Sequence, residues 1–159
     1  MLKVEFIGGA KTVTGSCFLL TTDTQKILVE CGSFQGSKDL EKRNYLPFPF
    51  VPSEITALIL THAHIDHSGL IPKLTKSGFK GKIFATRPTV DLSEIMLFDS
   101  AHIQEMEAVW KNRKRERAGK NLITPLYTVD DSKNSMKFFE SVTYDTFISL
   151  APGIKIRFL

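Results

Sequence analysis

The sequence predicts a layered α/β fold, and two observations carry this prediction. The chain opens with three segments that read as strands: residues 2–7, in which apolar and polar side chains tend to alternate, and residues 16–21 and 26–30. From residue 55 onward, predicted strands and helices follow one another. Opening strands followed by strand–helix alternation are typical of layered α/β domains. The 159 residues are enough for one such domain with its own core.

Turn residues and side-chain type set the middle elements. Residues 22–25 would join the second and third strands as a hairpin. Residues 55–60 are apolar and partly β-branched, which predicts a buried strand. A short helix over 68–77 would end at Gly78, and residues 82–85 form the next predicted strand.

A long helix is predicted over about 89–114. Its large side chains recur at three- and four-residue steps and give a mostly apolar stripe, the pattern of a helix that packs on a core. The stripe consists of Leu92, Ile95, Met96, Asp99, Ile103, Met106 and Trp110.

The last third of the chain is predicted to hold one more helix and three strands. Thr128 and Asp131 have the spacing of a capping box, with Asp in place of Glu, and the helix would extend to about Phe139. The predicted strands are residues 140–144, 146–150 and 154–159, with a Pro–Gly turn between the last two.

Composition places the chain among ordinary globular proteins. Hydrophobic residues make up 42% and charged residues 24% of it. No apolar run approaches the ~20 residues of a membrane span, and the first residues already read as a strand, so neither a signal peptide nor a membrane partner is expected. Cys17 and Cys31 are expected to be reduced thiols of a cytoplasmic protein. The net charge of +4 fits a polyanionic partner without requiring one.

The segment 61–69 concentrates the chain's metal-binding chemistry. It contains three of the four histidines, His62, His64 and His67, together with Asp66. Imidazole nitrogens and carboxylate oxygens are zinc ligands, and a hydrolytic zinc site needs a few of them plus an open position for water. The segment follows a predicted strand and leads into a predicted helix, so the ligands would lie where open α/β sheets place their sites.

The spacing refines this prediction. His62 and His64 are two residues apart, so an extended loop could direct both to one side. Asp66 and His67 are adjacent and would point apart, which favours two neighbouring metals. The alternative is a polar loop with surface histidines, and four ligand-type side chains within six positions count against it.

The pattern His62-x-His64-x-Asp66-His67 resembles the signature of the metallo-β-lactamase fold. Residues 8–16, 31–36, 85–89 and 99–104 resemble the RNA-processing branch of that fold, the β-CASP nucleases. The resemblance covers nearly all of the chain. It implies that residues 1–159 are the amino-terminal part of a metallo-β-lactamase domain, the first half of an αββα sandwich. The rest of that domain and the β-CASP domain would lie outside these residues.

The same resemblance implies the chemistry. The protein would be a zinc-dependent hydrolase, a ribonuclease with endonuclease activity, 5′-exonuclease activity or both. One zinc ion would be held by His62 and His64 and a second by Asp66 and His67. A metal-bound hydroxide, which Asp66 would help to orient, would cleave the phosphodiester bonds of RNA.

Glu30 occupies a position where the family usually has aspartate. The resemblance implies that this carboxylate organises the site from outside the ligand set, since such carboxylates fix the orientation of metal ligands. A solvated charge at a strand end is the alternative for Glu30.

Two other functions remain open on the same residues. The first is a metallo-hydrolase of a small ester, thioester or lactam. The second is a non-catalytic RNA-binding subunit, although all four residues of the motif are present.

The end of the sequence leads to a further expectation. The predicted strand 154–159 alternates and then stops, and members of the family are much longer and supply further ligands. The chain is therefore expected to be an amino-terminal fragment with two ligands per zinc ion, weak or absent zinc binding and no significant activity of its own. An unpaired edge at this strand would favour a homo-oligomer.

The long helix carries one more histidine and a basic cluster. His102 is expected to be a hydrogen-bonded helix residue and not a fifth ligand. Six basic residues fall within ten positions: Lys111, Arg113, Lys114, Arg115, Arg117 and Lys120. They could contact RNA phosphates, or they could form a solvated helix end whose cations suit the dipole. No aromatic residue interleaves with these charges, so base stacking is not expected.

Overall fold

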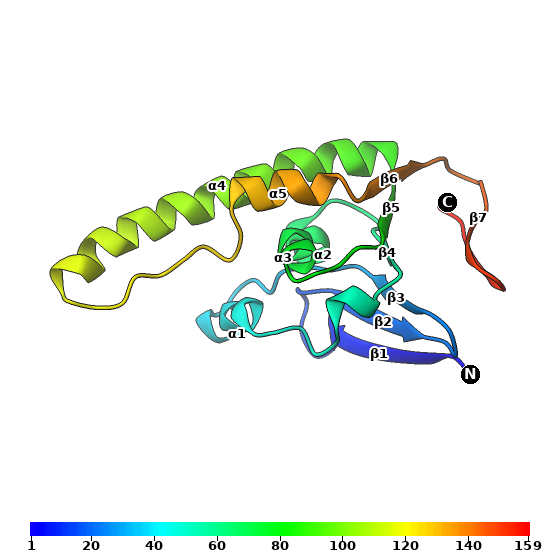
Figure 1. Cartoon of the computed structure of the whole chain (residues 1–159), viewed down its shortest axis with the longest axis horizontal. Helices are drawn as coiled ribbons and strands as arrows, with labels where there is room; N and C mark the ends of the chain where they lie inside the picture. Colours follow the sequence, from blue (N-terminus) through cyan, green and yellow to red (C-terminus); the bar gives the residue numbers. More distant parts are fainter.

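A computed structural model describes residues 1–159, and Figure 1 shows its layers. The central sheet has six strands in the order of the chain. The strands are β1 (Lys3–Gly8), β2 (Cys17–Thr21), β3 (Lys26–Val29), β4 (Ala57–Ile59), β5 (Lys82–Thr86) and β6 (Phe139–Val142). The pairs β1–β2 and β2–β3 are antiparallel, and the pairs from β3 to β6 are parallel. The α/β prediction is confirmed.

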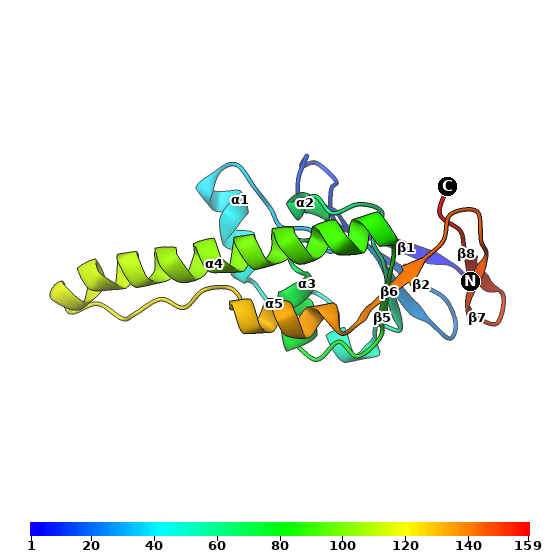
Figure 2. The same ribbon diagram turned by 90° about the horizontal axis from the view of Figure 1, so that it is seen from above.

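Helices cover one side of the sheet, and a separate hairpin lies on the other side (Figures 1 and 2). The helices are α1 (Lys38–Lys42), α2 (Ile65–Ser68), α3 (Ile71–Lys76), α4 (Arg87–Arg117) and α5 (Val129–Met136), with 3₁₀ turns at Arg43–Tyr45 and Pro52–Glu54. The hairpin consists of β7 (Ile148–Ala151) and β8 (Ile154–Ile156). None of these helices is both long enough and apolar enough to cross a membrane.

The main core lies between the sheet and the helices. Leu28, Leu58 and Ile83 occupy one level across β3, β4 and β5, and all three are fully buried. Ile71 and Leu74 of α3 pack against them and are also fully buried. Burying side chains of this size contributes about 1.5–3 kcal/mol each. This layer fixes the strands and the short helices that carry the candidate site.

The opposite face of the sheet is only partly covered. At the β4–β6 end, the β7–β8 hairpin packs on Ala57, Phe84 and Val142. At the β1–β2 end, Phe6 lies edge-on to Phe18 with ring centroids 5.6 Å apart and remains 66% exposed. The sheet thus has two apolar faces, of which one carries the helices. This is the arrangement of one half of an αββα sandwich, as expected.

Several element bounds differ from those expected. The helix predicted over 68–77 is two short helices, α2 and α3, separated at Gly69 and Leu70. The last helix has the predicted capping box of Thr128 and Asp131 but ends at Met136. The strand predicted over 154–159, which was expected to present an unpaired edge, forms only at Ile154–Ile156 and pairs with β7 in a two-stranded sheet.

The apolar stripe predicted for α4 does not face the core. Its large members Leu92, Ile95, Ile103, Met106 and Trp110 are exposed. The buried positions are Thr89, Ser93, Leu97, Ala101 and Ala108. Small side chains allow α4 to lie close to α5, where the buried Ser132 hydroxyl donates to the carbonyl oxygen of Leu97 at 3.1 Å. The stripe prediction was wrong because the contact depends on small residues.

This assignment of the faces of α4 can be tested with two neighbouring side chains. Leu97 is 0% exposed and Ile95 is 67% exposed. We expect Leu97→Ala to lower the free energy of unfolding by about 2–5 kcal/mol, because it leaves a cavity in the core. Ile95→Ala should change it by less than about 0.5 kcal/mol. Urea unfolding of both variants provides the measurement, and a larger loss for Ile95→Ala would reverse the assignment.

Candidate metal centre

The candidate ligands lie at the carboxyl end of β4. Because β3 and β4 are parallel, the segments that follow them emerge at the same edge of the sheet. Glu30 directly follows β3, and the segment from His62 to His64 follows β4 and leads into α2. Asp66 and His67 are in the single turn of α2, whose amino end begins after His64. All four candidate ligands therefore lie at this edge of the sheet, but Asp66 and His67 are in a helical turn and not in the predicted loop.

Backbone hydrogen bonds hold α2 against the ends of β2 and β3. The amide of Cys31 donates to the carbonyl of His67 at 2.8 Å, and the amide of Ser16 donates to the carbonyl of Asp66 at 2.9 Å. Ser33 donates to the carbonyl of Ile65 at 3.0 Å. The carbonyls of Ile65, Asp66 and His67 are thus bound by neighbouring segments, so a helix too short to be stable alone is fixed in position.

This close approach requires glycine at position 32. A Cβ atom there would lie 1.7 Å from the carbonyl oxygen of Asp66 and 2.6 Å from the amide nitrogen of His67. Both are backbone atoms, which cannot move aside as a flexible side chain could. Gly32 is therefore a positioning residue for the two ligands on α2.

The three histidines of the motif form a cluster. The ring centroids of His62 and His64 are 4.8 Å apart, and those of His62 and His67 are 4.0 Å apart. The Nδ1 atom of His62 lies 2.9 Å from the hydroxyl of Thr61, which leaves its Nε2 atom free. Residues two apart do bring their rings together on one side, as expected for His62 and His64.

Asp66 and His67 approach each other instead of pointing apart. The Oδ2 atom of Asp66 lies 3.5 Å from the Nε2 atom of His67. Adjacent residues can do this because they are in one helical turn and not in an extended loop. Two ligands of one tetrahedral zinc, each about 2.0–2.1 Å from it, are about 3.4 Å apart. The spacing of these two atoms suits a shared metal ion.

Glu30 faces this cluster and is 3% exposed. Its Oε1 atom accepts a hydrogen bond from the amide of Thr61 at 3.1 Å. Its Oε2 atom lies 3.6 Å from the Nδ1 atom of His67, and both atoms are buried without a hydrogen-bond partner. The carboxylate is therefore not a solvated strand-end charge. It lies behind the ring of His67, on the side opposite Asp66.

Burial shapes the charge state of both groups. It raises the pKa of Glu30 to about 7, against the opposing effect of the hydrogen bonds with Thr61. It also lowers the pKa of His67, with a further contribution from the charge of His62. A neutral imidazole is the form that binds a metal ion.

The donor set and its two unpartnered buried atoms fit a metal ion. A ligating histidine usually donates a hydrogen bond from its second ring N–H to a carboxylate. The carboxylate of Glu30 lies near the Nδ1 atom of His67 in the position of such an acceptor. However, no three His, Cys, Asp or Glu side chains are arranged to hold one ion together. The residues thus offer pairs of ligands, and a complete hydrolytic zinc site requires more.

Other candidate residues lie apart from this centre. His102 is exposed on α4, its side chain makes no hydrogen bond, and its ring contacts none of the other histidines. Cys17 and Cys31 are free, buried thiols of the main core, and a hydrogen bond with Cys17 raises the pKa of Cys31. The five basic residues from Lys111 to Arg117 lie at the far end of α4, which projects away from α2 and the sheet (Figures 1 and 2).

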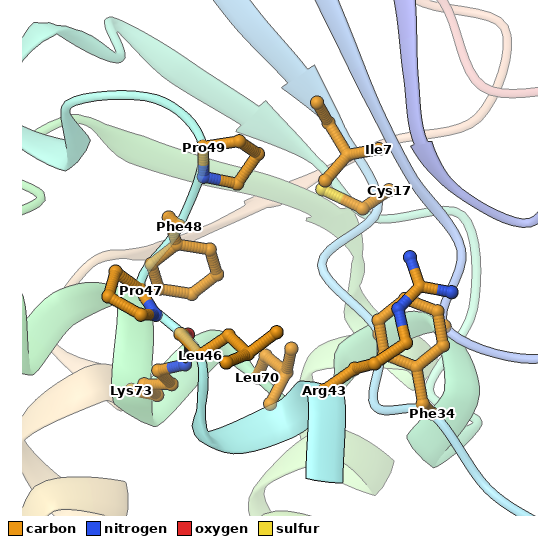
Figure 3. Close-up of a pocket in the computed structure, with 12 residues that line it drawn as sticks. Ile7, Cys17, Phe34, Arg43, Leu46, Pro47, Phe48, Pro49, Leu70 and Lys73 are labelled. Carbon is orange, nitrogen blue, oxygen red and sulfur yellow. Dashed lines mark hydrogen bonds between the residues drawn. The ribbon is translucent and has the colours of Figure 1, made fainter. Parts of the chain in front are cut away.

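A cavity of about 210 Å³, lined in part by Gly32, is shown in Figure 3. Phe34, Phe48 and Leu70 line it, together with Cys17. The Lys73 ammonium at its edge donates to the carbonyls of Asn44 and Leu46. None of the four predicted ligands lines this cavity, so it is separate from the candidate metal centre.

The role of Gly32 yields a direct prediction. We expect Gly32→Ala to lower the free energy of unfolding by about 3 kcal/mol, because α2 must move away from β3. The control is Gly119→Ala. Gly119 has a positive φ of 62° but open space around its Cβ position, so its cost should be about 1 kcal/mol of backbone strain. Urea unfolding compares the two, and equal losses would mean that the contact at Gly32 is not restrictive.

Comparison with known proteins identifies a family and relatives of this chain. The family model of the metallo-beta-lactamase superfamily matches residues 10–91, about half of the chain. Ribonuclease TTHA0252 of Thermus thermophilus is 44% identical over 104 residues, which cover 65% of this chain and 24% of that protein. Transcription termination factor FttA of Methanosarcina mazei is 34% identical over 158 residues, 99% of this chain and 23% of that protein. The chain thus spans about a quarter of the length of these relatives.

The fold is also found in solved structures. MEM-A1, a subclass B3 metallo-beta-lactamase from a soil metagenome library, superposes with a TM-score of 0.50 at 15% identity, over 94% of this chain and 46% of that one. The likeness at this identity concerns the fold alone. The family match includes all four residues of the His62–His67 motif. The chain belongs to the metallo-beta-lactamase superfamily.

Proposed function

We propose that these residues contribute the first metal ligands of a zinc-dependent ribonuclease. The observation that carries the proposal is the cluster of three imidazoles and one carboxylate at the amino end of α2. The relatives of this chain include a protein named as a ribonuclease and proteins named as transcription termination factors. RNA is therefore the proposed substrate. The protein is proposed to belong to the RNA-processing β-CASP branch of the superfamily.

The proposed roles are those that the family resemblance implies, and the positions of the side chains are compatible with them. His62 and His64 would hold one zinc ion, and Asp66 and His67, whose donor atoms are 3.5 Å apart, would hold the other. Bound zinc would lower the pKa of a coordinated water to about 7 and stabilise charge that develops on the phosphate. Asp66 is the acidic ligand and can also accept a hydrogen bond from the attacking group.

Glu30 would act through His67. By accepting a hydrogen bond from the Nδ1 atom of His67, it would keep the Nε2 atom unprotonated and aimed at the metal. The fixed backbone at Gly32 and the hydrogen bond from Thr61 hold the two groups in place. This is a positioning role, since Glu30 lies behind the ligand.

Two ligands per ion are too few for a hydrolytic zinc site, which normally has three protein ligands. The remaining ligands would come from elsewhere in a longer polypeptide, as the length of the relatives suggests. We therefore expect residues 1–159 alone to bind zinc weakly and to cleave no RNA. Endonuclease and 5′-exonuclease activity are both compatible with this arrangement.

The proposal predicts different effects for two histidine variants. In residues 1–159, His64→Ala should abolish zinc binding at the His62–His64 pair, measured by calorimetry, because it leaves that ion with a single ligand. Binding at the Asp66–His67 pair should remain. His102→Ala is the matched control and should leave zinc binding unchanged, since His102 is exposed on α4 and apart from the cluster.

The polypeptide encoded up to the natural stop codon provides the test of activity. It should bind two zinc ions and cleave RNA, and His64→Ala should lower the cleavage rate by at least about 100-fold. A small ester or lactam that is hydrolysed while RNA is not would favour the small-substrate alternative. Tight stoichiometric zinc in residues 1–159, or RNA cleavage that survives His64→Ala, would contradict the proposed ligand set.

A further inference from the structure

The carboxyl end of α4 and the segment after it form an ordered arm that extends beyond the rest of the fold (Figures 1 and 2). We call residues 107–123 the α4 tip. The side-chain Nδ2 atom of Asn112 donates to the backbone carbonyl of Ile123 at 2.9 Å, and its Oδ1 atom accepts from the backbone amide of Ile123 at 2.9 Å. The Arg115 side chain donates to the carbonyl of Asn121 at 2.5 Å. These bonds hold the returning segment against the helix, so the surface of the α4 tip is preorganised.

The α4 tip holds the chain's main concentration of positive charge. It has six basic and two acidic residues, a formal net charge of +4 that equals the net charge of the whole chain. Only one of the six cations is in an ion pair, that of Lys111 with Glu107. Arg113, Lys114 and Arg117 are exposed and have no acidic partner. A surface of this kind is complementary to a polyanion.

An aromatic side chain stands within these charges, contrary to expectation. Trp110 precedes the basic run in sequence, but the helix places Lys114 one turn after it. Trp110 and Lys114 together line two adjacent surface hollows. Lys111, Arg115 and Lys120 complete one hollow, and Arg113 and Arg117 complete the other. The two hollows therefore flank one tryptophan with cations on both sides.

The indole ring is available for a ligand. Trp110 is 70% exposed, its Nε1 atom makes no hydrogen bond, and no cation of the protein stacks on its ring. Leaving so large an apolar group in water forgoes the stabilisation that burial would give. An exposed tryptophan between unpaired cations is suited to a ligand that is both planar and anionic.

We propose that the α4 tip binds single-stranded RNA, with a base stacked on Trp110 and phosphates bound by the flanking cations. A single strand is required because the bases of a duplex are stacked on each other and cannot reach the indole. Charge complementarity favours a polynucleotide over an apolar protein surface. The choice of RNA rests on the proposed function, but binding at the α4 tip requires neither zinc nor cleavage.

Trp110 is the only tryptophan of the chain, so its fluorescence reports on this surface alone. The experiment titrates residues 1–159 with oligouridine of about ten nucleotides in the presence of a chelator. We expect saturable quenching of the fluorescence of Trp110. In parallel, anisotropy of labelled oligouridine should show that Trp110→Ala weakens binding by about 5- to 150-fold, the effect of losing one stacked base. Trp110→Phe should retain most of the affinity.

Matched variants separate stacking from charge. Ile95→Ala removes another exposed apolar side chain of α4 and should leave binding unchanged. The double variant Lys114→Gln, Arg117→Gln should reduce the slope of log K against log salt by about 1.4, because two phosphate contacts are lost. Lys80→Gln, at an exposed lysine remote from the α4 tip, is the control for charge and should leave the slope unchanged.

Three results would overturn the proposal. Affinity of Trp110→Ala equal to wild type would exclude stacking. Equal binding and quenching by duplex RNA of the same length would show a purely electrostatic surface. Loss of self-association in Trp110→Ala with unchanged RNA affinity, measured by analytical ultracentrifugation, would assign the surface to protein contacts. The titration contains chelator, so it tests RNA binding without zinc. A negative result would not contradict the proposed metal centre, and a lack of zinc binding would not contradict RNA binding at the α4 tip.

Discussion

The candidate site depends on the attachment of a single helical turn to the edge of a sheet. Helix α2 is too short to be stable alone, yet its carbonyls accept hydrogen bonds from Ser16, Cys31 and Ser33. The absence of a side chain at Gly32 allows these backbones to meet. The strands are in turn fixed by the core between the sheet and α3. The positions of Asp66 and His67 are therefore set by backbone atoms, which explains how two adjacent side chains are directed to one place.

The sequence indicated where the candidate site lies because most of its residues are close together in the chain. The apolar strand, the four ligand-type residues and the following helix are contiguous, and parallel strands bring Glu30 to the same edge. The structure adds the backbone conformation of Glu30, which has a positive φ of 64°. Aspartate is favoured in this left-handed region more than most side chains, which gives a physical reason for aspartate at this position in the family. Glu30 adopts this conformation, and its carboxylate accepts a hydrogen bond from the Thr61 amide and lies 3.6 Å from the Nδ1 atom of His67.

The features that the sequence did not predict depend on packing between distant segments. Hydrophobic periodicity on α4 predicts that the large side chains are buried, whereas the buried positions of the helix include the small residues Ser93, Ala101 and Ala108. That choice leaves Ile95 and Trp110 exposed. The contact of Asp66 with His67 was also not predicted, because it follows from the helical turn of α2 and not from the spacing of the motif. In the sequence Trp110 precedes the basic run, but in the helix it lies beside the basic side chains of the α4 tip.

The central claim is that His62, His64 and His67 form one metal-binding cluster from which His102 is excluded. NMR spectra of the imidazole groups test it most directly, because the chain has only four histidines. On titration of residues 1–159 with excess zinc, the account predicts that the resonances of His62, His64 and His67 shift or broaden together while those of His102 stay in place. Unchanged resonances for the three clustered histidines, or a zinc response at His102 alone, would contradict it.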